Sequence, residues 1–170
     1  MKRILTMAAM AIGLSGAASA QDIMPKGSAG GWNVFLNGAT NGCFIQRETE
    51  QGIFLQIGTE AALVELMPDD PIGFLSIWIP GEAPANSDPA ELVLVEIGPN
   101  SYIGAAARGA REGYHGATVL AQGSELGFDL RNRRAMTITA SNGAVVKVQL
   151  NASDVSSALD ALADCQSEVS

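Results

Sequence analysis

Apolar and polar residues alternate with a period of two in several short segments, and this pattern limits the fold more than any other feature. The alternation is clearest over residues 136–140 and 146–150, which flank Asn142 and Gly143. An Asn-Gly pair between two alternating segments predicts a β-hairpin, because both residues tolerate the positive φ of a tight turn. The same alternation recurs over residues 43–48, 53–57 and 93–97. The chain is therefore predicted to be mainly β.

Two segments have helical spacing instead. Over residues 124–134, Ser124 is a candidate N-cap, and Leu126 and Leu130 lie four apart. Near the end of the chain, Ser153 is predicted to cap a helix. Its apolar positions at helical spacing are Val155, Ala158, Leu159 and Leu162. We expect an antiparallel sandwich or a strongly curved sheet, with the C-terminal helix packed on it and one short helix before the last hairpin.

The first twenty residues are typical of an export signal. Lys2 and Arg3 precede an apolar run over residues 4–14, and small residues follow it. A run of about 11 residues is shorter than the roughly 20 that a membrane-spanning helix needs. Cleavage is therefore expected between Ala20 and Gln21, with no stable membrane insertion after the signal is removed.

The chain is divided into a cleaved signal peptide over residues 1–20, a flexible lead-in over residues 21–31, and one β-rich domain over residues 32–170. Cleavage leaves 150 of the 170 residues, a length that suits a single core. The leader holds two of the ten basic residues and none of the eighteen acidic ones, so the mature chain has a net charge of −10. Because phosphates repel such an acidic chain, no nucleic-acid partner is expected.

Both cysteines, Cys43 and Cys165, lie in the mature chain. An exported protein meets an oxidising compartment, so one intramolecular disulfide is predicted. It would join the first strands to the last helix across about 120 residues. A redox-active thiol is the alternative interpretation, but the chain has no CxxC spacing.

Most familiar catalytic patterns are missing. His115 is the one histidine, and no HExxH, EF-hand, GxSxG or SxxK pattern occurs, so neither a metal nor a cofactor is expected. His115 lies between Gly113 and Gly116, which favours an exposed turn over a catalytic base. Trp32 and Trp78 lie in strand-like segments, so core packing is favoured over an exposed ligand platform.

Two charged clusters are candidate sites. Asp69 and Asp70 lie between prolines, and a solvated turn is favoured over paired carboxylates in acid/base chemistry or cation binding. Arg131, Arg133 and Arg134 form the one basic cluster and are the candidate residues for binding an anionic group. The favoured alternative is that they lie at a helix C-terminus, where cations stabilise the helix dipole and pair with nearby carboxylates.

The order of these features resembles the invasion-associated locus B family of exported bacterial proteins. Trp32 is soon followed by Cys43, a β-rich middle comes next, and a segment rich in small residues, 151–165, ends in Cys165. The chain is also similar to small uncharacterised periplasmic proteins of alphaproteobacteria. The resemblance implies an exported β-sandwich-like domain with a role at the envelope or in host contact, and it brings no catalytic residues. Members of the family typically carry further cysteines in the middle, where this chain has none.

The leading hypothesis is a non-enzymatic periplasmic or secreted protein that binds an envelope component or a host protein. One rival is a small hydrolase-type enzyme whose dispersed site includes His115, Asp69 and Asp70. Another is a small-molecule carrier, which would have a dry cavity between sheet and helix. A cleft that joins His115 to a carboxylate and a hydroxyl would favour the enzyme.

Overall fold

A computed structural model describes residues 23–59, 72–81, 92–107, 112–122, 125–139 and 143–169. These residues form one ten-stranded antiparallel sheet in the order β1-β2-β3-β4-β5-β8-β7-β6-β9-β10. The strands are β1 (Ile23–Ala29), β2 (Trp32–Asn37), β3 (Gly42–Glu48), β4 (Phe54–Thr59), β5 (Ile72–Pro80), β6 (Leu92–Ile97), β7 (Asn100–Ala107), β8 (Tyr114–Gln122), β9 (Ala135–Thr139) and β10 (Val145–Gln149). The helices of the described residues are α2 (Glu125–Asn132) and α3 (Ala152–Val169).

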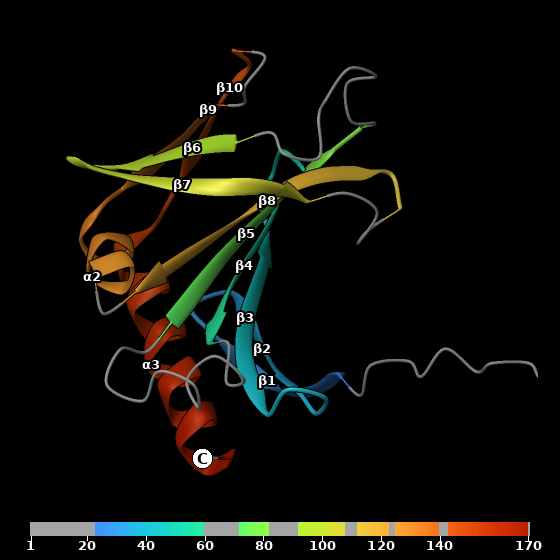
Figure 1. Ribbon diagram of the computed structural model, residues 1–170. Helices are drawn as coiled ribbons and strands as arrows, with labels where there is room; N and C mark the ends of the chain where they lie inside the picture. Colours follow the sequence, from blue (N-terminus) through green and yellow to red (C-terminus); the bar gives the residue numbers. More distant parts are fainter. Residues whose placement is uncertain are drawn as a thin grey trace, which may run out of the picture.

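The sheet bends strongly without closing, and β1 and β10 are its two edges. In Figure 1, β6 and β7 run from side to side, whereas β2–β4 run from top to bottom. Both helices lie in the angle between these two groups of strands. The predicted fold class is therefore confirmed: mainly β, with a C-terminal helix on the sheet and a short helix before the last hairpin.

The face of the sheet that meets the helices forms the core. Its side chains come from alternate positions of each strand, as the period of two predicts. Ile45, Leu55, Leu75 and Val119 are examples that are almost fully buried. They belong to one cluster with the apolar face of α3, formed by Val155, Ala158, Leu159 and Leu162. We call this face the inner face and the opposite one the outer face.

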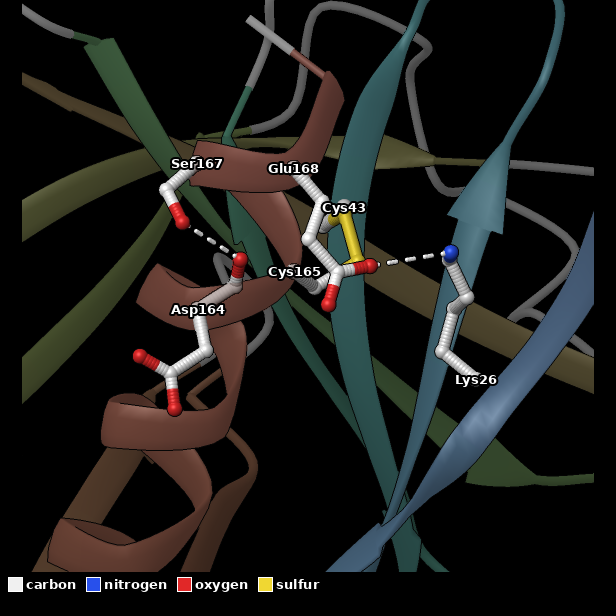
Figure 2. A network of polar contacts seen from close by, with 6 residues as sticks. All are labelled: Lys26, Cys43, Asp164, Cys165, Ser167 and Glu168. Atoms are coloured by element: carbon white, nitrogen blue, oxygen red, sulfur yellow. Dashed lines mark hydrogen bonds and ion pairs between the residues drawn. A yellow bond between two sulfur atoms is a disulfide. The ribbon is translucent and has the colours of Figure 1, made fainter.

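The predicted disulfide is present and fastens α3 to the sheet. Cys43 on β3 and Cys165 on α3 are joined across a sequence separation of 122, and both are buried. The neighbouring Gln166 accepts a hydrogen bond from the Cys43 backbone N–H at 3.0 Å. Figure 2 shows a second link beside it, the 3.1 Å ion pair between Lys26 of β1 and Glu168. Because this pair is largely exposed, the covalent bond is the main restraint.

The first strand differs from the prediction. The sequence predicts a flexible lead-in over residues 21–31, whereas Ile23–Ala29 form β1, paired with β2. The register shifts between Pro25 and Gly27. Almost every β1 side chain is exposed, so the strand has no burial pattern that its sequence could reveal. Backbone pairing with β2 determines its structure instead.

The cap of α3 also differs from the prediction. Asn151, rather than Ser153, caps the helix, because Asn151 Oδ1 accepts hydrogen bonds from the Ser153 backbone N–H at 3.1 Å and from Ser153 Oγ at 2.8 Å. Asn is among the best N-cap residues, and its oxygen satisfies an N–H of the first turn that has no partner within the helix. The predicted cap Ser124 and the predicted cleavage site at Ala20 and Gln21 lie outside the described residues.

A buried carboxyl group connects α2 to β7. Asp129 of α2 is 1% exposed and accepts hydrogen bonds from Tyr102 Oη at 2.6 Å and from Asn100 Nδ2 at 2.8 Å. Burial raises the pKa of Tyr102 well above its usual value, and the hydrogen bond to Asp129 raises it further. The Tyr102 phenol therefore stays protonated in the folded protein.

The raised pKa of Tyr102 predicts a loss of stability in alkaline solution. In the unfolded chain this tyrosine ionises near pH 10, whereas in the folded protein it does not, so rising pH above about 10 stabilises the unfolded state. Tyr102→Phe removes this effect. We expect the difference in free energy of unfolding between wild type and variant, measured in urea, to be smaller at about pH 11 than at about pH 8. An unchanged difference would contradict the assignment.

Candidate functional site

The outer face carries a continuous row of apolar side chains, which we call the outer apolar row. It consists of Leu94, Ile103, Leu120, Phe74, Phe44 and Phe35. The strand register brings these residues together: Leu94 is opposite Ile103, and Phe74 is opposite Leu120. Gly104 is opposite Val119 at the end of the β7–β8 ladder, so Ile103 and Leu120 lie next to this pair, opposite one another in the same register. Residues far apart in sequence thus become neighbours across the sheet.

The part of the row on β6, β7 and β8 is exposed to solvent. Ile103 is 65% exposed, Leu120 58% and Leu94 37%. Single exposed apolar side chains are ordinary, whereas contiguous ones mark interaction surfaces. Since the inner face already supplies the core, these three side chains are not needed to hold the domain together. They form a surface suited to contact with another molecule.

The other end of the row is aromatic. The rings of Phe35 and Phe44 stack with centroids 5.2 Å apart. Gly58 lies between Phe44 and Phe74, and a Cβ atom there would be 2.7 Å from an atom of each phenylalanine. A hollow of about 180 Å³ opens beside these two rings. Phe44 and Phe74 line this hollow together with several polar side chains, so this end of the row borders a partly polar hollow.

The polar groups beside the row have partners within the protein. Ser76 Oγ and Thr118 Oγ1 are 2.8 Å apart. Trp78 Nε1 donates to Gln56 Oε1 at 3.0 Å, and Gln56 Nε2 donates to Gln46 Oε1 at 2.9 Å. The prediction that Trp78 is buried is confirmed. These polar side chains form hydrogen bonds with one another. The apolar row is therefore the part of the outer face that is left to contact another molecule.

A separate pocket of about 330 Å³, which we call the edge pocket, lies where the end of β10 and the start of α3 approach β2, β3 and β4. Its lining includes Trp32, Arg47, Leu55, Val148, Leu150 and Val155. Trp32 is 1% exposed, which confirms its predicted burial. No described residue accepts a hydrogen bond from its indole Nε1. A buried donor of this kind calls for an acceptor, and the part of the chain that the structure describes does not supply one.

The lining of the edge pocket is partly polar. Arg47 Nη1 is 3.4 Å from Asp154 Oδ2, so the charge of the guanidinium is balanced. Thr49, Glu50 and Gln51 also line the pocket and make part of it polar. The small-molecule carrier stays a prediction. The pocket suits an apolar group that carries a hydrogen-bond acceptor.

His115 lies in a strand, and the prediction of an exposed turn is wrong. It belongs to β8, opposite Ile79, and is half-buried. Its Nδ1 atom is 3.2 Å from the carbonyl oxygen of Gly81. Asp69 and Asp70, its partners in the enzyme hypothesis, lie outside the described residues.

The three candidate anion-binding arginines occupy different surroundings. Arg131 Nη2 is 2.8 Å from Asp160 Oδ1 on α3, as expected of a cation in the last turn of α2. Arg133 packs over Gly98, so closely that a Cβ atom there would clash with it. Its Nε is buried and has no partner among the described residues. Arg134 is exposed. Anion binding by these residues stays a prediction.

Within the described ranges, no three His, Cys, Asp or Glu side chains lie close enough to hold a metal ion. Neither described helix is long and apolar enough to cross a membrane. No known protein family, curated protein or solved structure matches the chain. The family resemblance therefore stays a prediction, and functional inference rests on the two surfaces.

The sequence alone does not reveal the outer apolar row, although it holds one clue. Leu94 alternates with Val93 and Val95, so it lies on the same face as Glu96. A leucine on a face that alternation marks as polar is the sign of an exposed apolar position. Ile103 and Leu120 lie in a stretch where glycine and alanine blur the alternation, so their side of the sheet becomes clear only from the register.

Proposed function

We propose that the chain is an exported, non-enzymatic binding protein and that the outer apolar row contacts another protein. The observation that carries this proposal is the exposure of Leu94, Ile103 and Leu120 as direct neighbours on three adjacent strands. Export is supported by the leader-like residues 1–20. The buried disulfide suits the oxidising compartment that export would reach.

Charge favours a protein partner over a lipid surface. The mature chain has ten more acidic than basic residues, so anionic headgroups would repel it. Glu96 lies on the outer face, one position along from the row, and is exposed. A partner with an apolar patch bordered by basic residues would match both features.

A second copy of the chain is a poorer match. The outer face is the convex face of the bent sheet, since the helices lie on the side toward which it bends (Figure 1). Two convex faces meet over a small area, whereas a specific interface buries roughly 800 Å² on each partner. Two acidic copies would also repel one another. The favoured occupant is a different protein.

Replacement of two exposed residues of the row is expected to weaken partner binding without unfolding the protein. Because Ile103 and Leu120 are exposed, Ile103→Ser and Leu120→Ser should leave thermal stability nearly unchanged, and each should weaken binding about tenfold through lost apolar burial. The measurement is co-purification from the envelope fraction, followed by affinity measurement with the protein recovered.

Phe128→Ser is the matched control, because Phe128 is 63% exposed but lies on α2, away from the row. We expect wild type and Phe128→Ser to retain the partner. The Ile103→Ser/Leu120→Ser double variant should lose it. A partner held equally by all three proteins would contradict the proposal, as would self-association through the row in sedimentation experiments.

A further inference from the structure

Within the part of the chain that the structure describes, β10 is an edge strand paired on one side only. In the β9–β10 ladder Gln149 is opposite Ala135, and the Leu150 backbone N–H donates to the Arg134 carbonyl at 2.6 Å in the same register. Antiparallel ladders alternate between hydrogen-bonded and non-hydrogen-bonded pairs. The backbone N–H and C=O groups of Val145, Lys147 and Gln149 therefore point away from β9, and β10 pairs with no other strand of the described residues.

The edge pocket continues this open edge. Val148, Gln149 and Leu150 all line it, and Trp32 lines the same pocket. Val148 and Leu150 are buried, inner-facing residues, whereas Gln149 is exposed. A residue paired with Val148 on an added strand would share its side of the sheet, so its side chain would be directed toward the pocket.

The opposite edge of the sheet is protected. Pro25 in β1 has no backbone N–H, and the register of this strand shifts between Pro25 and Gly27. Lys26 is held in an ion pair with Glu168 of α3. These are features by which proteins prevent an edge strand from pairing. Of the two edge strands, β10 is therefore the one that can accept a further strand.

From these observations we infer that the free edge of β10 binds an extended peptide segment of another protein. The segment adds as an antiparallel strand, and one apolar side chain enters the edge pocket. Main-chain hydrogen bonds to Lys147 and Gln149 supply affinity, and the pocket supplies specificity. Trp32, whose buried indole N–H has no partner among the described residues, lines the pocket that this side chain enters. This site is distinct from the outer apolar row and goes beyond the proposed function.

Lys147 indicates the chemistry of the segment. It is exposed at the centre of β10. Two copies of β10 paired antiparallel about this residue would place like charges directly opposite, which is unfavourable. A different chain with an acidic residue opposite Lys147 avoids that repulsion. Because Val148 follows Lys147, the preferred segment carries an apolar residue immediately before the acidic one.

The test uses a capped hexapeptide, Val-Thr-Leu-Asp-Val-Thr, with the full mature protein. On binding we expect slower amide hydrogen exchange at Lys147 and Gln149 and a shift of the Trp32 indole N–H resonance. Replacing the peptide leucine by alanine should weaken binding roughly tenfold. Lys147→Glu should weaken binding roughly fivefold, and a peptide with lysine in place of aspartate should restore it.

Lys147 is exposed, so the charge-reversed variant keeps the fold, and thermal unfolding verifies this. Protection confined to β1, or binding that is indifferent to both the leucine and the charge exchange, would overturn the inference. An absence of binding at millimolar peptide would overturn it as well. A failure of the Ile103→Ser/Leu120→Ser experiment would leave these readouts unaffected, so the two proposals are tested separately.

Discussion

Loss of the Cys43–Cys165 disulfide is expected to lower the free energy of unfolding by about 4 to 5 kcal/mol. The bond closes a loop between positions 122 apart, and opening it returns a large loop-closure entropy to the unfolded chain. A domain of this size is typically stable by only about 5 to 15 kcal/mol, so the loss would be a large fraction of the total. Urea denaturation of oxidised wild type and of the Cys43→Ala/Cys165→Ala variant measures it.

Reduced wild type is the matched control, because it keeps both side chains and lacks only the cross-link. Its stability should fall nearly as far as that of the double variant. Since Cys43 and Cys165 are 0% and 5% exposed, reduction in native buffer should be slow and should speed up in denaturant. A difference below about 1 kcal/mol between oxidised and reduced protein would show that packing of α3, and not the bond, holds the helix in place.

Replacement of Asp129 by alanine is expected to destabilise the domain by about 3 kcal/mol. The substitution removes the carboxyl group of a residue that is 1% exposed, and it leaves the Tyr102 hydroxyl and the Asn100 amide without their acceptor. Loss of this carboxyl group also removes the hydrogen bonds that link α2 to β7. Asp129→Asn keeps one acceptor oxygen, so we expect a smaller loss of about 1 kcal/mol.

Asp160→Ala is the comparison for Asp129→Ala. Asp160 also makes a polar link to another element, the 2.8 Å ion pair with Arg131, but its side chain is 69% exposed. Exposed pairs contribute about 0 to 1 kcal/mol. Equal effects of Asp129→Ala and Asp160→Ala in urea titrations would contradict the assignment of Asp129 as a buried anchor.

Local patterns in the sequence were sufficient to predict the fold class. Alternation over residues 136–140 and 146–150 predicted β9 and β10, and the spacing of Val155 and Leu162 predicted the buried face of α3. The disulfide followed from two cysteines and the expected compartment. These predictions held because each depends on residues that lie close together in sequence or on a pair without competitors.

Long-range pairing could not be predicted in the same way. The order β5-β8-β7-β6-β9 places β8 beside β5 and β6 beside β9, and no local pattern specifies those neighbours. The outer apolar row depends on this order, because Leu94, Ile103 and Leu120 become adjacent only through it. The edge pocket likewise needs Trp32 and Leu150, which come from opposite ends of the domain.

The central claim is that the outer apolar row is a protein-binding surface, and site-specific photocrosslinking in the envelope tests it most directly. A photoreactive amino acid is placed at Ile103 in one protein and at Phe128, which is equally exposed but lies on α2, in another. We predict one discrete crosslinked protein from position 103 and none from position 128. The same product from both positions, or none from position 103, would contradict the claim.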